Sequence, residues 1–217
     1  MTKKERKQKK KLQMRNKRLI KKYYFLMPTD WRGKPYKDYD YTYTMWGCCM
    51  GWDKAYGDMY LKELGDAVLE SGQKDFTIFQ IKEKFGSHRV YVSGTTAKVL
   101  DIINKYELIS QGVCYSCGKP DVPIVGTFWI EPECYECFKK RVKRDGDTEE
   151  SIRKRYEEEI CDKKDKDGEY KLPDSFTVCH FGTGKDYDEV IDISDTVNKI
   201  RRRYEKLQKK RQSKGKN

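Results

Sequence analysis

The chain has 217 residues, of which 38% are charged and only 36% hydrophobic, and its formal net charge is +12. This length predicts one domain, or one domain with appendages, and the hydrophobic share is below that of typical globular domains. No run of about 18 apolar residues occurs and no apolar stretch follows the basic N-terminus, so we expect no membrane partner, no secretory signal and a cytoplasmic location.

Residues 1–26 are predicted to be a basic N-terminal helix or tail. The first 22 residues carry twelve Lys or Arg and one acid. A narrow apolar stripe that includes Leu19 and Ile20 predicts a helix of marginal stability on its own. Such an end attracts polyanions through counterion release, although a solvated tail would have the same composition. The candidate nucleic-acid contacts here are Lys9, Lys10, Lys11, Arg15 and Arg18.

Residues 27–112 are predicted to form an α+β core, in which a small antiparallel hairpin sheet is packed by helices. Apolar residues first recur at helical spacing and then alternate over two short runs. The expected elements are a helix over 51–71, strands over 76–81 and 89–92 joined by a turn at residues 85–88 that contains His88, and a helix capped by Thr95 or Thr96.

Residues 113–144 carry the strongest chemical signal. Cys114-x-x-Cys117 and Cys134-x-x-Cys137 are separated by sixteen residues. This spacing predicts a zinc ribbon with a strand at 127–130, because each pair of cysteines can place two thiolates on one ion. Four sulfur ligands fill a tetrahedral coordination sphere, so we expect a structural Zn²⁺ ion without an open position for catalysis.

The rest of the chain divides into an acidic and a basic segment. Residues 145–193 are predicted to form a helix begun by an Asp147–Glu150 capping box and a strand over 175–181. The acidic side chains could face a basic partner or belong to an ordinary solvated helix. Residues 194–217 are predicted to form a basic helix and tail, with Arg201, Arg202 and Arg203 as candidate nucleic-acid contacts.

The other cysteines and the two histidines leave the question of a second site open. Cys48, Cys49, Cys161, Cys179 and His180 could form a second metal site only if three distant segments met, so buried free cysteines are the default interpretation. Neither histidine has a neighbouring nucleophile. A nuclease without histidine remains an alternative, in which Asp75 with Gln80-Ile81-Lys82 forms the catalytic pattern and Glu83 helps to hold Mg²⁺.

Three motifs occur in an order that resembles a family of uncharacterised phage and prophage zinc-knuckle proteins. They are Cys48-x-x-Gly51-Trp52, Lys82-Glu83-Lys84-Phe85-Gly86-x-x-Arg89-x-Tyr91, and Cys114-x-x-Cys117-Gly118 followed by Trp129 and Cys134-x-x-Cys137. The chain departs from that family at Cys49-Met50, where Gly-Asp is usual, and at Cys137, where many members have His. From the hairpin motif we take Glu83, Lys84, Arg89 and Tyr91 as a candidate contact surface; a Glu–Arg pair that only holds the hairpin is the equal alternative.

The resemblance implies a phage or mobile-element protein that acts inside a bacterial cell, and it implies no reaction. We therefore expect a non-enzymatic protein that binds and inhibits a host defence nucleoprotein, in the manner of an anti-CRISPR inhibitor. The acidic segment would meet the positively charged channel of a CRISPR effector nuclease, while the basic ends would meet nucleic acid. The alternatives are a nucleic-acid-binding accessory protein of phage transcription or replication, and a metal-dependent nuclease.

Overall fold

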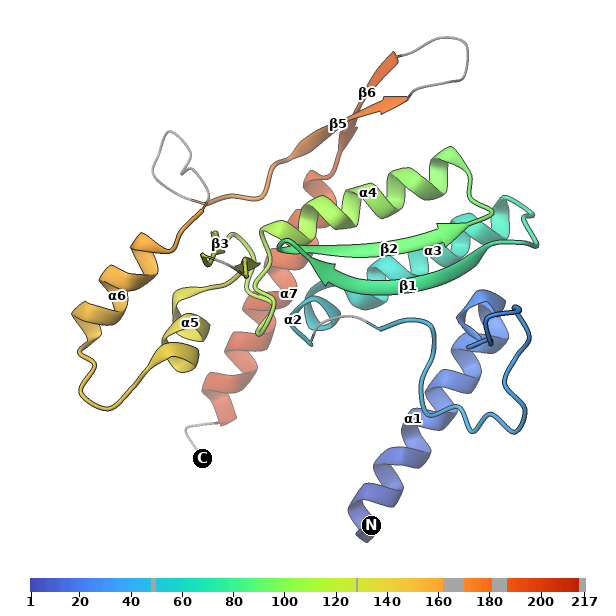
Figure 1. Ribbon diagram of the computed structural model, residues 1–217, viewed down its shortest axis with the longest axis horizontal. Coiled ribbons are helices and arrows are strands. Elements are labelled where there is room, and N and C mark those ends of the chain that lie inside the picture. The colour runs from blue at the N-terminus through green and yellow to red at the C-terminus, as the bar shows by residue number, and fades with distance from the viewer. Residues whose placement is uncertain (48–49, 128, 162–169, 181–186, 215–217) are drawn as a thin grey trace.

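The computed structural model describes residues 1–47, 50–127, 129–161, 170–180 and 187–214, and the fold is α+β as predicted (Figure 1). In these ranges every sheet is a two-stranded antiparallel pair: β1 with β2, β3 with β4, and β5 with β6. The helical elements are α1 (Lys3–Lys22), η1 (Tyr24–Leu26), α2 (Met50–Trp52), the π-helical segment η2 (Asp53–Gly57), α3 (Asp58–Glu70), α4 (Ala97–Gln111), α5 (Tyr135–Val142), α6 (Glu149–Glu158) and α7 (Ser194–Lys214). The strands are β1 (Thr77–Lys84), β2 (Ser87–Ser93), β3 (Ile124–Val125), β4 (Glu131–Pro132), β5 (Ser175–His180) and β6 (Tyr187–Asp192).

The main core lies between the β1–β2 hairpin and helices α3 and α4, and it is rich in aromatic rings. The rings of Tyr60 and Tyr106 are stacked with centroids 4.2 Å apart and 10° between their planes. Trp52, Tyr56 and Tyr60 are fully buried. Helix α4 begins where predicted, because the Thr96 hydroxyl accepts a hydrogen bond from the Val99 amide. Aromatic packing of this kind supplies much of the apolar area that a charge-rich chain needs.

The hairpin turn is shorter than predicted, and His88 lies in β2 and not in the turn. Phe85 and Gly86 alone form the turn, with φ values of 52° and 75°. The ladder therefore extends to the Lys84–Ser87 pair. His88 is 1% exposed, and burial lowers its pKa to about 4. The imidazole is thus a neutral core side chain at physiological pH.

Two other local predictions are corrected by the structure. The capping box of α6 consists of Thr148 and Ser151, not Asp147 and Glu150, because the Thr148 hydroxyl accepts from the Ser151 amide. The strand predicted at 127–130 is replaced by the short pair β3–β4 on either side of it. Asp147 and Thr148 are adjacent and both side chains can cap a helix, so the sequence alone does not decide between them.

Helix α7 is part of the main core and not a pendant basic tail. Its apolar stripe places Val197 and Ile200 at 0% exposure in the same cluster as the hairpin and α3. Arg201 donates to both oxygens of Asp121, from Nε at 2.8 Å and from Nη2 at 2.8 Å. Arg203 forms an ion pair with Asp58 of α3. The basic face of α7 is therefore tied to the body at these two positions.

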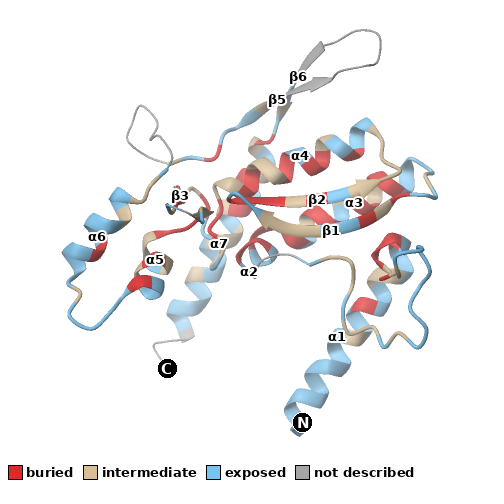
Figure 2. Cartoon of the chain, in the orientation of Figure 1, coloured by how far each residue is buried: buried red, intermediate tan, exposed pale blue. Residues whose placement is uncertain are grey.

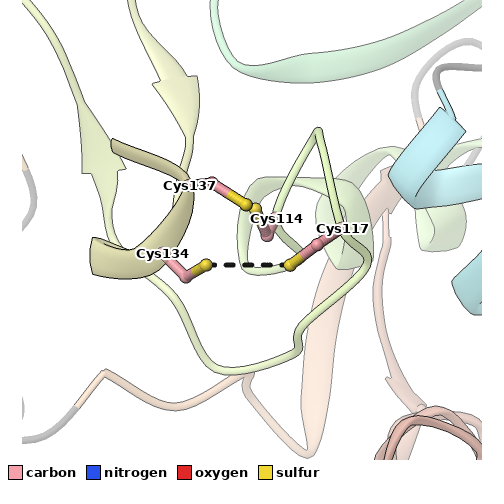
Figure 3. A group of neighbouring side chains, drawn as sticks. All are labelled: Cys114, Cys117, Cys134 and Cys137. Carbon is pink, nitrogen blue, oxygen red and sulfur yellow. Dashed lines mark hydrogen bonds between the residues drawn. The ribbon is translucent and has the colours of Figure 1, made fainter. Parts of the chain in front are cut away.

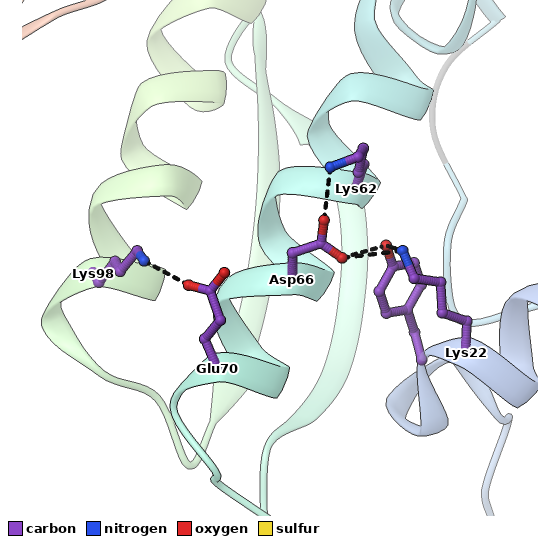
Figure 4. A network of polar contacts seen from close by, with 6 residues as sticks. Lys22, Lys62, Asp66, Glu70 and Lys98 are labelled. Atoms are coloured by element: carbon purple, nitrogen blue, oxygen red, sulfur yellow. Dashed lines mark hydrogen bonds and ion pairs between the residues drawn. The ribbon is translucent and has the colours of Figure 1, made fainter.

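The buried part of helix α1, in contrast, lies in its C-terminal half (Figure 2), and its N-terminal half contacts the body through an ion pair between Lys9 and Asp40. The side-chain amide of Asn16 donates from Nδ2 to the Tyr41 carbonyl at 2.9 Å, and Tyr23 is buried against Gly65 of α3. Residues 3–12 of α1 are fully exposed. A carboxylate on α3 strengthens the attachment, since Asp66 accepts hydrogen bonds from Lys62, Lys22 and Tyr23 (Figure 4).

The attachment of α1 is expected to weaken in acid through Asp66. Hydrogen bonds from Lys62, Lys22 and Tyr23 hold the pKa of the Asp66 carboxyl well below its ordinary range. The resulting stabilisation is complete above the unfolded-state value of about 4 and disappears as pH falls through the lower folded-state value. Urea unfolding should show that Asp66→Asn destabilises the protein at pH 7 and that the difference from the wild type shrinks toward pH 2. A difference that does not change with pH would contradict this.

Candidate metal centre

Four cysteines come together at the junction of the main core and the β3–β4 pair (Figure 3). The sulfur atoms of Cys114, Cys117, Cys134 and Cys137 all lie within 4.8 Å of one another, and all four thiols are free. The Cys117 and Cys134 sulfurs are 3.7 Å apart. Zn–S bonds of about 2.3 Å in a tetrahedron give sulfur–sulfur distances of about 3.8 Å. The cluster is thus a site that can hold one metal ion.

The first cysteine pair lies in a tight turn directly after α4. The Gly118 amide donates to the Cys114 carbonyl at 2.9 Å, and the Cys114 amide donates to the Lys119 carbonyl at 2.8 Å. Gly118 has a φ of 81°, a conformation that glycine adopts without a steric penalty. This turn brings the two sulfurs to one side of the backbone, as the spacing predicted.

The second cysteine pair lies at the start of α5. Cys134 is the N-cap residue, and its carbonyl accepts from the amides of Cys137 and Phe138 at 3.0 Å. The pair is joined to the first by the Tyr115 amide, which donates to the Pro132 carbonyl at 2.8 Å. A helix N-terminus favours negative charge, so it suits thiolate ligands.

The first pair is pressed against α2, a contact that the cysteine spacing does not reveal. The Gly51 amide donates to the Tyr115 carbonyl at 2.9 Å, and the Trp52 indole donates to the Val113 carbonyl at 2.8 Å. A Cβ on Gly51 would lie 2.2 Å from the Cys114 carbonyl oxygen, and one on Gly118 would lie 2.6 Å from the Gly51 carbonyl oxygen. The Gly-Trp motif therefore holds half of the metal site in place.

The buried residue Glu133, which precedes the second cysteine pair, is connected to both α5 and α6. Glu133 is 3% exposed and accepts two hydrogen bonds from the Arg141 guanidinium, at 3.2 Å from Nε and 2.7 Å from Nη2. The Tyr156 hydroxyl on α6 donates to the Glu133 carbonyl at 2.8 Å. The residue that precedes Cys134 thus organises both helices, as outer-shell groups do around metal sites.

The arrangement of the four sulfurs requires a cation if they are to ionise together. Hydrogen bonds from Cys114 and Cys134 lower the pKa of the Cys117 thiol, while hydrogen bonding to Cys114 raises that of Cys134. Burial and the neighbouring sulfurs raise the pKa of Cys137 to about 12. A divalent metal would replace the thiol protons, and four soft sulfur donors in a tetrahedron suit zinc or an iron–sulfur cluster better than magnesium or calcium.

A second metal site is not found in the part of the chain that the structure describes, where the four-cysteine cluster is the only group of three or more ligating side chains. Cys161 is exposed, contrary to the expectation of a buried thiol, and its sulfur donates to the Gly126 carbonyl at 3.0 Å. Cys48 and Cys49 and the side chains of Cys179 and His180 lie outside the described residues.

The carboxylates of the nuclease alternative are separated by the length of β1. Asp75 precedes the strand and Glu83 lies near its far end. At about 3.3 Å per residue their backbones are about 25 Å apart, too far for one Mg²⁺ ion. Lys82 contacts the ring of Tyr91, with Nζ 4.8 Å from the centroid. These residues therefore do not form one catalytic site.

The candidate contact surface divides into two parts. Lys84 and Tyr91 are exposed. Arg89 is half-buried and pairs with Glu107 of α4, whereas Glu83 accepts a hydrogen bond from the Gly86 amide at 2.7 Å. The Glu–Arg pair predicted within the hairpin is therefore formed with α4 instead.

The candidate nucleic-acid contacts also differ between the two ends of the chain. In α1, Lys9 forms an ion pair with Asp40, and Lys10, Lys11, Arg15 and Arg18 are all exposed. In α7 Arg202 is exposed, while its neighbours Arg201 and Arg203 form the ion pairs described above.

Comparison with known proteins adds no further information on this site. Neither a model of any protein family, nor a curated protein, nor a solved structure matches the chain. No helix in the described ranges has the length and apolar character required to cross a membrane.

Proposed function

We propose that this chain is a non-enzymatic nucleic-acid-binding protein, in which structural zinc at the four-cysteine cluster organises the fold and α1 provides the binding surface. The observation that carries the proposal is the exposed basic half of α1. Residues 3–12 include seven Lys or Arg, and every one of these ten residues is exposed. At 1.5 Å per residue the 20-residue helix is about 30 Å long, so its free half can follow a phosphate backbone.

The charge density of α1 favours a polyanion over solvent as its neighbour. Like charges spaced three or four residues apart repel one another on a helix. The Thr2–Glu5 capping box fixes the N-terminus of the helix but neutralises only one charge. Phosphate groups on a bound nucleic acid would remove the repulsion along the whole free half. Binding should therefore also increase the helicity of α1.

Inhibition of a host defence nucleoprotein, such as a CRISPR effector, is the narrower form of this proposal that the phage-family resemblance supports. In that form the ligand of α1 is guide or target nucleic acid within a complex. Three of the five acidic residues at 149–159 have local basic partners, which reduces the acidic charge that α6 offers to another molecule. Glu149 pairs with Lys139, Glu158 lies 3.9 Å from Lys154, and Glu159 lies 3.0 Å from Arg155. The basic surface therefore carries the proposal.

Charge removal on α1 tests the proposal directly. Lys10, Lys11, Arg15 and Arg18 would be changed together to Gln, and the affinity for a labelled DNA duplex measured by fluorescence anisotropy from 50 to 300 mM salt. The wild type should lose affinity steeply with salt. The slope of log affinity against log salt should be smaller in the variant by up to about 3.6, because each of the four phosphate contacts contributes about 0.9.

A matched control removes the same charge from the other end of the chain. Lys206, Lys209, Lys210 and Arg211 are exposed in the last turns of α7, and their change to Gln should leave the slope nearly unaltered. If both variants weaken binding equally, binding depends only on net charge and the proposed role of α1 is contradicted.

Incubation of the protein with DNA and Mg²⁺ should leave the DNA intact, and specific cleavage would contradict the proposal that the protein is not an enzyme. Co-purification from a bacterial host then tests the narrower form.

A further inference from the structure

The β1–β2 hairpin exposes aromatic rings on the face turned away from the helices. Phe79, Phe85 and Tyr91 are 63%, 69% and 39% exposed, although large aromatic side chains are usually at least partly buried. We propose that this face, which we call the hairpin platform, binds the unpaired bases of single-stranded nucleic acid. The inference deepens the proposed function and rests on it, since it names the class of nucleic acid that the protein prefers.

Strand pairing builds the platform. Tyr91 is opposite Gln80, and Lys82 follows two residues later on β1, so these residues share the face that alternates with the buried Val90 position. Arg89, opposite Lys82, instead pairs with Glu107 of α4. An irregularity in the ladder between Ile78 and Gln80 adds one residue, Phe79. Phe79 and Gln80 are consecutive and both exposed, whereas strict alternation would bury one of them. The irregularity thus adds a second ring to the face that already carries Tyr91.

Positive charge accompanies the rings. The ammonium group of Lys82 lies 4.8 Å from the Tyr91 centroid, and that of Lys84 lies 5.3 Å from the Phe85 centroid. The Glu83 carboxylate near this end of β1 accepts a hydrogen bond from the Gly86 amide at 2.7 Å and stabilises the turn. Aromatic rings interleaved with cations match a single strand, because rings stack on bases while cations contact the phosphates between them.

The conformation of Phe85 provides an independent observation. Phe85 and Gly86 both have positive φ, as in a type I′ turn, where Asn or Gly normally occupies the first position. A bulky residue in this region costs on the order of 1 kcal/mol, and the exposed ring recovers little of that cost by packing. Strain of this kind is found at functional sites, and here it presents an aromatic ring at the tip of the hairpin.

The end of the platform that carries Phe79 is close to the end of α1 that is attached to the body. The rings of Phe25 in η1 and Phe76, which precedes β1, meet edge to face with centroids 4.9 Å apart. Figure 1 shows the C-terminal end of α1 beside the start of β1. A single strand stacked on the hairpin can therefore continue toward the basic helix. A protein partner would favour a continuous apolar patch, and the interleaved lysines interrupt one here.

The test compares single-stranded and duplex DNA of the same length, by fluorescence anisotropy with the full-length, zinc-loaded protein. We expect Phe79→Ala with Tyr91→Ala to weaken single-strand binding at least about tenfold, because each stacked base contributes about five-fold or more. Duplex affinity should change by less than about twofold. Tyr91→Phe, which keeps the ring, should bind as the wild type does. Trp31→Ala is the matched control, since Trp31 is 86% exposed and also carries a cation, Arg32, over its ring.

The outcomes separate this inference from the proposed function. If the double variant binds single-stranded DNA like the wild type, or loses affinity for single-stranded and duplex DNA equally, the proposed role of the hairpin platform is contradicted. The proposed role of α1 is unaffected by either result. If the double variant fails on single strands and the α1 variant binds like the wild type, the platform holds and the proposed role of α1 is wrong. Loss of a host protein partner without any change in oligonucleotide affinity would assign the face to protein and overturn the inference.

Discussion

Replacement of Cys137 by alanine is expected to remove the metal from the protein and to unfold helices α5 and α6. Cys137 lies in the first turn of α5, where alanine is a better helix former, so the change removes a ligand without breaking the helix. Loss of a structural metal belongs to the small class of changes that destabilise by more than about 4 kcal/mol. Elemental analysis should give about one zinc per wild-type chain and close to none in the variant.

The control for this change is Cys161→Ala. Cys161 is exposed and lies outside the cluster, so its removal should leave both metal content and stability close to wild type. Hydrogen exchange would locate the damage in Cys137→Ala: amides of α5 and α6 should lose protection, while those of α3 and α4 should keep it. Stoichiometric zinc in the Cys137 variant, or its loss from the Cys161 variant, would refute the assignment of the ligands.

Gly51→Ala should detach the first cysteine pair from the core. The new methyl group would overlap the carbonyl oxygens of Cys114 and Tyr115, at 2.2 and 2.4 Å, and these are backbone atoms that cannot rotate away. Overpacking of this kind costs about 1–3 kcal/mol and outweighs the gain of less than about 1 kcal/mol that alanine brings to a helix. We expect urea unfolding to show a net loss of about 2 kcal/mol and a competition assay to show weaker zinc binding.

Gly47 offers a comparison at a nearby exposed position. A Cβ there would meet nothing within 4 Å, so Gly47→Ala should be neutral in both assays. If Gly51→Ala were equally neutral, α2 would not hold the metal site as we describe.

The parts of this molecule that sequence reasoning predicted depend on local patterns. The four clustered cysteines follow from the spacing within each Cys-x-x-Cys pair, and the hairpin follows from two alternating runs. The two-residue hairpin turn is not predictable from sequence, because a Phe-Gly pair with positive φ values is an unusual start for a type I′ turn. The sequence therefore predicts a longer turn that includes His88, although His88 is a core residue of β2.

The contacts that could not be predicted join segments far apart in the sequence. The pairing of Arg89 with Glu107 depends on how α4 crosses the hairpin, and no local spacing specifies it. The same holds for Gly51 and Gly118, whose close approach is set by the tertiary packing of α2 on the knuckle. In α7 the stripe of Val197 and Ile200 predicts the helix, but it does not specify which elements the helix packs against.

The docking of Gly51 and Trp52 makes the two halves of the cysteine cluster unequal. Cys114 and Cys117 are anchored to the rigid body by backbone and indole hydrogen bonds, whereas Cys134 and Cys137 belong to a short helix that packs chiefly on α6. We therefore expect Cys114 and Cys117 to bind the metal ion first. The arm formed by α5 and α6 would then bring Cys134 and Cys137 to the ion. In a zinc-starved cell that arm would be the first part of the protein to open and the first to be degraded.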